Sequence, residues 1–590
     1  MTTEEKDKDS MGPPSPTVDK LPETSLWTNS KCLLICALVS LANMQYGLDS
    51  ACLAALQAMP GFLKVFGYPD PSAPGGYGIG HTFQQLLSSF LTLGSLLSTL
   101  FAGPFSHLYG RRPALLLACF LTALGTAIQI GTSSAAALYV GRIILGIGNG
   151  FLVTFSNIYC AEVAPPHLRG VMVALFSEWV CVGSVLGAVV TNATKGWLGK
   201  GSWRVPLGVL FVVPVVLSAG VWWVVPESPR WEVSRGRYQE GRRALERLRA
   251  VGEDDKEGQE RLEVEWVEMV KGIEEEKRLA STAGPLDMFR GSDLRRTLLC
   301  FGVIATQAGS GSWFYISYST YFMIVSGLPV DLSFKYSIMK TCIRFVGVNV
   351  GMYLMRYVMG RRTLMTTGAV VQGMFMLGMA ISATTEAGTR RARDSLIACS
   401  ALFNFAYNAF VGIASYPVAT ELVSTRLRSY TVGAAISLGY FLAWLTSFCS
   451  PYFINPENMN WGAKYGYIWA GSNFCCALFF FFFLPELKGR ALEEIDELFE
   501  RRVPAWKFKS AETSIVSEAI KERGEVGEDG EKPATVRDCR GAREGVYMQT
   551  DANAIMPQPK SITSRNNATG NRKTTNKATP SPPQSHLYLY

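Results

Sequence analysis

The chain has 590 residues, of which 48% are apolar and only 18% are charged, with a net charge of +8 at pH 7. Soluble domains carry about 25% charged residues, so the composition argues against a soluble multidomain enzyme. The positive charge is not gathered on one element, which argues against a nucleic-acid-binding protein.

The first 31 residues mix acidic, basic and proline residues without a secretory signal, so we expect a disordered cytoplasmic N-terminus. Apolar runs then follow in close succession, each near the length of about 20 residues that crosses a hydrocarbon core of about 30 Å. We predict spans at 32–56, 82–105, 113–131, 136–160, 171–192 and 205–225, which together make an N-terminal bundle over residues 32–225.

A polar segment at 226–296 has acidic and basic residues at helical spacing, which indicates short cytoplasmic helices. A second set of spans occupies residues 297–484, at 297–326, 333–357, 363–384, 394–420, 430–454 and 463–484. The polar tail at 485–590 is predicted to be cytoplasmic and mostly disordered. A dozen apolar runs cannot all hide in one soluble core, so we predict an all-α membrane protein with twelve transmembrane helices.

Three short motifs occur twice in the same order, each time at the end of the corresponding span. They are Gly110-Arg-Arg112 with Gly360-Arg-Arg362, Glu162…Arg169 with Glu421…Arg428, and Pro226-Glu227 with Pro485-Glu486. Such a repeat predicts two pseudo-symmetric six-helix bundles with a binding site between them near the membrane midplane. The arginine-rich turns favour a cytoplasmic position for that end of the spans, although Arg390, Arg391 and Arg393 fall in a turn that span parity places outside.

Further motifs carry a family resemblance: Gly141-Arg142, Tyr159-x-x-Glu162-x-Ala-Pro165, Pro226-Glu-Ser-Pro-Arg-Trp231 and Pro485-Glu-Leu-Lys-Gly-Arg490. The chain resembles the sugar porter family of the major facilitator superfamily, and especially its fungal hexose, maltose and α-glucoside permeases. The resemblance implies the major facilitator fold and a plasma-membrane location. We also expect activity as a monomer without a cofactor, and the cysteines, which lie along the apolar runs, do not indicate a metal site. The chain departs from the family pattern at His107 and Tyr357, which replace acidic residues before the Gly-Arg-Arg turns.

An aspartate and an arginine stand out within the apolar spans. Asp49 lies in the first span and Arg142 in the fourth, where an ionised group needs a cavity or a partner of opposite charge. The resemblance implies that this acid couples transport to protons against the arginine. The alternative is a permanent ion pair that only holds the two spans together.

Charged residues where the spans meet the cytoplasm resemble the family's cytoplasmic gate, which closes by bridging the halves. They are Arg111, Arg112, Glu162, Arg169, Arg361, Arg362, Glu421 and Arg428. The simpler alternative is that the arginines only anchor the loops inside.

A sugar site needs hydrogen-bonding side chains near the midplane, and an aromatic face can stack on the ring. The candidates are Gln307, Tyr318, Asn349, Asn408, Tyr416 and Trp444, together with Ser177 at the position of a family glutamine that binds sugar. The resemblance favours Gln307, Tyr416 and Trp444, although an aromatic residue in a span often serves packing alone.

Three more charges lie within the spans. Lys340 and Arg344 are one helical turn apart in the eighth span and Glu178 lies in the fifth. A shared face toward the cavity predicts a site for a substrate carboxylate. Alternatively, Glu178 neutralises one cation, or Lys340 extends to the membrane interface.

The sequence thus predicts a secondary transporter of a hexose or α-glucoside that works by alternating access, with a proton as the co-transported ion. Alternatives are a transporter of organic or sugar acids such as quinate, a proton-independent uniporter, and a non-transporting sugar sensor. The glycines from Gly146 to Gly150 favour close helix packing over a nucleotide site, because no strand precedes them. Asn192 begins a glycosylation sequon on the outer side.

Overall fold

The computed structural model describes residues 29–71, 76–165, 169–249, 255–281, 284–325, 327–385, 389–455, 458–490, 492–511 and 513, with only the backbone for 169–174. Within these residues, 11 helical segments are long and apolar enough to cross a membrane. A twelfth span consists of two helices, α13 (Gly291–Gly309) and α14 (Ser312–Val325). The prediction of an all-α membrane protein with twelve spans is confirmed.

The first half contains six spans, two of them bent. Its helices are α1 (Ser30–Ser40), α2 (Ala42–Leu56), α4 (His81–Tyr109), α5 (Arg111–Gly131), α6 (Ala135–Val163), α7 (Arg169–Thr194), α8 (Gly201–Val209) and α9 (Val212–Trp223). Between the first two spans lie the short helix α3 (Pro60–Phe66) and a small hairpin of β1 (Tyr68–Pro69) and β2 (Tyr77–Gly78), whose strands are antiparallel.

Three helices and a 3-10 turn connect the halves: α10 (Pro229–Ser234), α11 (Tyr238–Arg249), α12 (Lys256–Ser281) and η2 (Pro285–Phe289). The second half continues after α13 and α14 with α15 (Val330–Tyr353), η3 (Leu354–Val358), α16 (Arg361–Thr385), α17 (Arg390–Ala406), η4 (Tyr407–Gly412), α18 (Ile413–Leu422), α19 (Arg428–Ile454), η5 (Gly462–Tyr465) and α20 (Gly466–Phe483). The helix α21 (Leu492–Glu500) and the turn η6 (Ala505–Lys507) follow.

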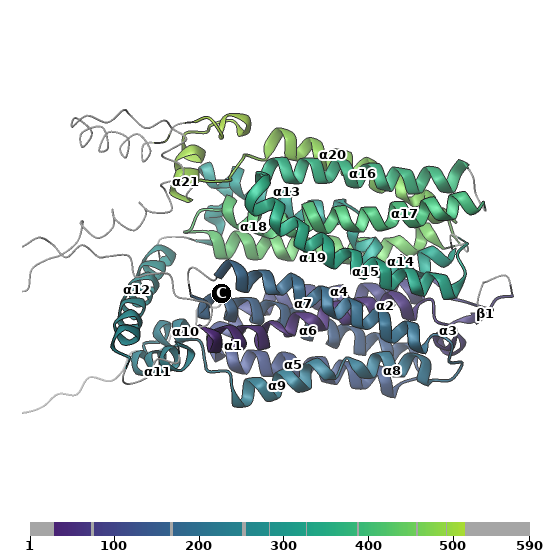
Figure 1. The fold of residues 1–590 in the computed structure, drawn as a ribbon, viewed down its shortest axis with the longest axis horizontal. Coiled ribbons are helices and arrows are strands. Elements are labelled where there is room, and N and C mark those ends of the chain that lie inside the picture. Colours follow the sequence, from purple (N-terminus) through teal and green to yellow (C-terminus); the bar gives the residue numbers. More distant parts are fainter. Residues whose placement is uncertain are drawn as a thin grey trace, which may run out of the picture. The chain divides into compact units, whose positions relative to one another are not determined.

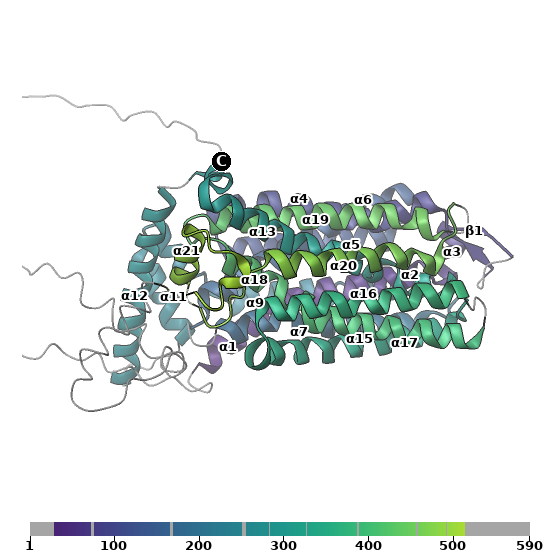
Figure 2. The same cartoon turned by 90° about the horizontal axis from the view of Figure 1, so that it is seen from above.

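The two halves lie side by side with their long helices aligned, as Figure 1 shows. The connecting helices and α21 gather at one end of the bundles, and the β1–β2 hairpin lies at the other (Figures 1 and 2). We call the first the Arg-rich end, because Arg111, Arg112, Arg361 and Arg362 lie there at the starts of α5 and α16, and the second the hairpin end. The halves meet where α4 packs on α19, α2 on α14 and α7 on α15.

Glycines on α6 allow its neighbours to approach closely. A Cβ atom on Gly146 would lie 2.2 Å from the backbone oxygen of Leu91 on α4, and one on Gly148 would lie 2.5 Å from Oγ1 of Thr122 on α5. Close approach of backbones at small residues is the usual packing of membrane helices. The prediction that this glycine run serves helix packing is confirmed.

The seventh span differs from the continuous helix expected over 297–326, because it is interrupted at Ser310 and Gly311. Gly311 has φ of +78°, a conformation that side chains disfavour. A Cβ there would also lie 2.7 Å from the ring of Trp469. The hydroxyls of Ser310 and Ser312 both donate to the carbonyl of Gln307 and satisfy a backbone group that the break exposes.

Candidate functional site

A buried ion pair joins the first and fourth spans. Arg142 Nη1 donates to Asp49 Oδ1 at 2.8 Å, and the side chains are 1% and 0% exposed. Asn149, two turns along α6, donates to the other carboxylate oxygen at 3.4 Å. The same Arg142 nitrogen also lies 3.5 Å from Gln129 Oε1. The structure therefore brings the two charges together inside the first half.

The arginine of this pair is only partly satisfied. Within the described residues, Nε and Nη2 of Arg142 and Oδ1 of Asn149 are buried without a hydrogen-bond partner. A buried charge that keeps a single strong partner depends heavily on that partner. The buried charge of Arg142 is therefore compensated chiefly by Asp49.

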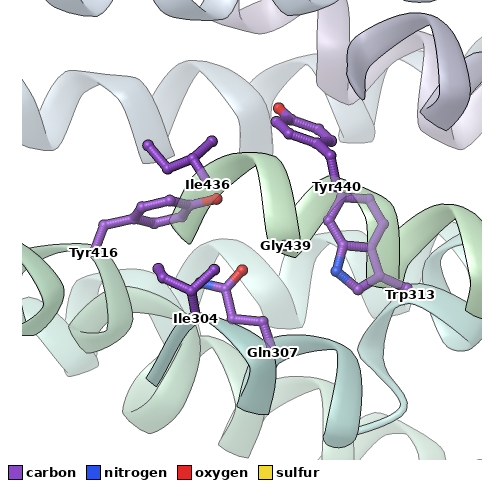
Figure 3. Close-up of a pocket in the computed structure, with 7 residues that line it drawn as sticks. All are labelled: Ile304, Gln307, Trp313, Tyr416, Ile436, Gly439 and Tyr440. Carbon is purple, nitrogen blue, oxygen red and sulfur yellow. The ribbon is translucent and has the colours of Figure 1, made fainter. Parts of the chain in front are cut away.

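A pocket lies in the second half at the break in the seventh span. It is lined by Ile304, Gln307, Trp313, Tyr416, Ile436, Gly439 and Tyr440. Figure 3 shows the side chains of Gln307, Trp313, Tyr416 and Tyr440 around the same space. An amide, an indole N–H and two phenol hydroxyls offer both donors and acceptors, and the rings offer apolar faces. The pocket thus presents both hydrogen-bonding groups and apolar ring faces to one small space.

Two residues predicted for the substrate, Gln307 and Tyr416, line this pocket, and three others lie elsewhere. The Tyr318 hydroxyl donates to the carbonyl of Ser447 at 2.5 Å, and its side chain is fully buried. Asn408 donates to the carbonyl of Asn404 within its own helix at 2.8 Å. Trp444 stacks on Phe448 and lies tilted against Phe441, both on its own helix α19.

The remaining predicted substrate and anion-site residues lie where α7 and α15 pack together. Ser177 and Glu178 are half-buried on α7, and Asn349 on α15 interacts with the Glu178 carboxylate. Arg344 Nη1 lies 3.5 Å from Ser184 Oγ of α7. Lys340 donates to Ser319 Oγ and lies 4.9 Å from the centre of the Tyr315 ring. Among the described residues, no ion pair joins Glu178 to either cation.

At the Arg-rich end, the first half has a compact charged cluster. Arg111 binds Glu162 through two nitrogens, with Nη2 at 2.6 Å and Nε at 3.0 Å. Glu227 accepts the backbone N–H groups of Arg111 and Arg112 at the start of α5. Burial raises the pKa of Glu227, and these N–H groups oppose that shift. The guanidinium of Arg112 caps the carbonyls of Val221 and Trp222.

The second half repeats this cluster. Arg361 binds Glu421 through Nη2 at 3.0 Å and Nε at 3.2 Å, and Glu486 accepts the backbone N–H of Arg361 at 2.7 Å. Arg362 caps the carbonyl of Phe481. In each cluster the ion pair joins residues of one half. The predicted gate residues therefore do not bridge the halves in the part of the chain that the structure describes.

The last pair of predicted gate residues is Arg169 and Arg428, and the structure describes the side chain of Arg428 alone. Arg428 starts α19, and its Nε and Nη2 are buried without partners among the described residues. Its counterpart Arg169 starts α7, but its side chain lies outside the described residues. The two departures from the family pattern also lie here: the carbonyl of His107 accepts Trp231 Nε1 at 2.9 Å, and Tyr357 packs on Tyr353.

Polar contacts at the hairpin end join the two halves. Asn455 donates to Gln84 at 3.1 Å, and Gln57 donates to the carbonyl of Ser317 at 3.2 Å. Lys195 forms an ion pair with Asp331 at 2.5 Å. The adjacent Asn192 is half-buried in the last turn of α7, where its amide oxygen accepts a hydrogen bond from Lys195.

Sequence reasoning missed several of these residues. Tyr440 lies one turn before Trp444 on α19, and helical periodicity alone does not say which aromatic faces the pocket. Trp313 follows the unpredicted break. Gln57, Gln84 and Asn455 are ordinary polar residues at span ends, and only their contact across the halves distinguishes them.

Two six-helix bundles with a buried ion pair and a polar, aromatic pocket define a membrane transporter. Residues 35–499 match the family described as sugar (and other) transporter, so the chain belongs to this family of the major facilitator superfamily. Transport, rather than enzymatic catalysis, is the activity of that class.

Curated relatives include fungal transporters. The chain is 30% identical to the alpha-glucosides permease MPH3 of Saccharomyces cerevisiae over 496 residues, which cover 82% of this chain and 80% of the permease. It is 28% identical to the major facilitator-type transporter ecdD of Aspergillus rugulosus over 494 residues, which cover 81% and 89% of the two chains. The hexose transporter 2 of Kluyveromyces lactis is 26% identical and covers 81% of this chain and 84% of its own length.

Among solved structures, the inward-open xylose transporter XylE from E. coli matches with a TM-score of 0.63 and 19% identity. The alignment covers 79% of this chain and 99% of XylE. The proton:xylose symporter XylE bound to 6-bromo-6-deoxy-D-glucose matches with a TM-score of 0.62 and 20% identity, covering 80% and 100% of the two chains. This similarity supports the two-bundle fold.

Proposed function

We propose that this protein moves a sugar, of hexose or α-glucoside type, across the plasma membrane by alternating access, coupled to a proton. The relatives include permeases named for α-glucosides and for hexoses. The observation that carries the coupling proposal is the buried pair of Asp49 and Arg142. A purely packed interface between α2 and α6 would not need two desolvated charges.

The sugar site centres on the pocket at the break of the seventh span. Gln307 supplies an amide for hydroxyl groups, while Tyr416 and Tyr440 supply phenol oxygens and Trp313 a ring face. The break places Gln307 and Trp313 on different helical segments, α13 and α14, around this space. A ligand bound here would contact both segments, so its affinity would depend on how α13 and α14 are placed relative to each other.

Alternating access requires contacts between the halves that form at one end and break at the other. In this structure the described polar contacts between the halves include Asn455, Gln57 and Lys195 at the hairpin end. Deeper in the bundles, Thr99 contacts Ser437 and Arg344 contacts Ser184. The ion pairs at the Arg-rich end stay within each half. With the arginine-rich turns facing the cytoplasm, the absence of an ion pair between the described gate residues of the two halves supports an inward-facing state.

Coupling follows from the charge balance around Arg142. With Asp49 ionised, the pair is neutral overall and α2 is tied to α6. A proton on Asp49 removes the opposite charge, weakens this tie and leaves the guanidinium with neutral acceptors such as Gln129. The two protonation states therefore favour different arrangements of the first half, which links the proton to the transport cycle.

The test is uptake of labelled glucose and maltose in cells that lack their own sugar carriers, with and without a protonophore. We expect accumulation that collapses with the protonophore. Asp49→Asn should abolish accumulation but retain equilibrating exchange. The matched control is Asp394→Asn, which makes the same chemical change on an exposed aspartate of α17.

Uptake that only equilibrates in the wild type would contradict proton coupling and make the ion pair structural. Absence of any uptake, with the protein present at the cell surface, would contradict sugar transport and favour a sugar sensor.

A further inference from the structure

Two cations on α15 lie at the junction of the two halves, and among the described residues neither has an acidic partner. Lys340 and Arg344 are one turn apart and half-buried. Arg344 reaches Ser184 of the first half, and its Nε is buried without a partner among the described residues. In that part of the chain neither residue forms an ion pair. Like charges on one helix face repel each other, and an anion bound between the two side chains would relieve this repulsion.

The nearby carboxylates do not fill this role. Asp49 is bound to Arg142, and the Glu178 carboxylate interacts with Asn349. Glu178 Oε1 is itself buried without a partner among the described residues. Because Glu178 lies on α7 and the cations on α15, it marks the opposite wall of the same junction.

A tyrosine hydroxyl lies between the helix of the cations and the sugar pocket. Tyr407 is in η4, which packs on α15, and its hydroxyl forms a hydrogen bond with Ser312, next to Trp313. Tyr416 and Tyr440 line the pocket. A guanidinium thus lies at one side of a region otherwise equipped with phenol hydroxyls and an amide.

We infer that the site accepts a sugar acid, with the carboxylate on Arg344 and the hydroxyl groups on the pocket side chains. Guanidinium binds a carboxylate with two parallel hydrogen bonds, and Nε of Arg344 is a donor without a partner among the described residues. Lys340, held by Ser319 and the Tyr315 ring, adds a second positive charge one turn away. This inference rests on the proposed transport function and specifies its substrate class.

The first test is ligand binding to the purified full-length protein, measured by the shift of its thermal unfolding midpoint. The probes are D-galacturonate and D-gluconate, each compared with its neutral counterpart, D-galactose or D-glucose. We expect the acids to stabilise the wild type more than the neutral sugars do. Arg344→Gln should weaken binding of the acids by about 30-fold or more, as expected for the loss of a desolvated charge pair.

The matched control is Arg356→Gln, which removes an exposed arginine from η3, the continuation of the same span. It should bind the acids like the wild type. If Arg344→Gln does not yield folded protein, Arg344→Lys keeps the charge but loses the paired hydrogen bonds, so it should bind the acids more weakly than the wild type while binding the neutral sugars equally. Lys340→Met should weaken acid binding by a smaller factor than the loss of Arg344.

The second test is uptake of the same four compounds in cells that lack their own carriers. Uptake of the neutral sugars without binding or uptake of the acids would overturn the sugar-acid inference and leave sugar transport intact. Wild-type affinity for the acids in folded Arg344→Gln would also overturn it. Absence of binding and uptake for all four compounds would contradict both the inference and the proposed function.

Discussion

Asn455, just after the eleventh span, donates a hydrogen bond of 3.1 Å to Gln84, in the first turn of the second span. The interaction continues into the first half, because Gln84 donates to Gln57 at 2.9 Å. Gln57 in turn donates to the carbonyl of Ser317 in the seventh span. This buried relay crosses between the halves twice, so separating the halves at the hairpin end breaks both crossings together.

We expect Asn455→Ala to favour opening of the hairpin end. The change removes one crossing and leaves the Gln84 oxygen without its donor, which is worth about 1 kcal/mol, or about a fivefold change in population. The measurement is the distance between spin labels at Thr82 and Met459, two exposed positions at this end in different halves.

The background for this measurement carries serine at the exposed cysteines Cys342 and Cys475. The control is Thr385→Ala at the same end, because the Thr385 hydroxyl donates only within its own helix, to Ile381. A distance distribution in Asn455→Ala equal to that of the control would contradict a role of the relay in closing the halves.

The ion pair of Lys195 and Asp331 should contribute little and should depend on salt. Asp331 is 61% exposed and is shared with Lys335, so only a small coupling energy is expected. The measurement is a double-mutant cycle of Lys195→Glu and Asp331→Lys, read by the same label distance. The coupling should vanish near 1 M salt, and a coupling that survives there would show that the pair is desolvated.

Glu227 and Glu486 should contribute equally to the free energy of unfolding. Each accepts backbone N–H groups at the first turn of a span, α5 or α16. Replacement of either with glutamine should lower the free energy of unfolding by about 1.5–3 kcal/mol, the range for hydrogen bonds to a charged group. Thermal unfolding of the purified protein checks this, with Glu268→Gln on the exposed face of α12 as the control. Loss of stability in only one of the two would show that the repeat is not equivalent in energy.

Gly146→Ala should destabilise the first half, whereas Gly103→Ala should not. A Cβ at residue 146 would meet backbone atoms of Leu91 at 2.2 Å, which the helices can relieve only by moving apart. Overpacking of this kind costs about 1–3 kcal/mol. A Cβ on Gly103 meets nothing within 4 Å, and alanine favours a helix there by about 0.5–1 kcal/mol. The thermal unfolding midpoint should fall in Gly146→Ala and rise or stay unchanged in Gly103→Ala, each relative to the wild type. Equal midpoints in the two variants would show that α4 and α6 accommodate the extra methyl group without loss of stability.

The fold was predictable because the spans and the duplicated motifs are properties of local sequence. Hydropathy locates a membrane helix without any knowledge of its neighbours, and the Gly-Arg-Arg and Pro-Glu repeats reveal the two halves. Asp49 and Arg142 were paired by the same reasoning, since a charge in hydrocarbon requires a partner.

The site was only partly predictable because it depends on which way side chains face. Tyr440 and Trp444 are both aromatic and one turn apart, yet only Tyr440 lines the pocket while Trp444 stacks on its own helix. The break at Gly311 depends on the packing of Trp469 from the twelfth span. The relay through Gln84 and Asn455 joins residues 371 positions apart, which no local pattern can indicate.

The break in the seventh span has a mechanical consequence. Gln307 precedes the joint and Trp313 follows it, so a molecule that fills the pocket touches both arms of a jointed helix. The outer arm, α14, also carries Ser317, which receives the hydrogen bond from Gln57. A ligand in the pocket and the contacts between the halves at the hairpin end are thereby connected through one rigid segment of α14. Trp313 and Ser317 are no more than two helical turns apart in this segment.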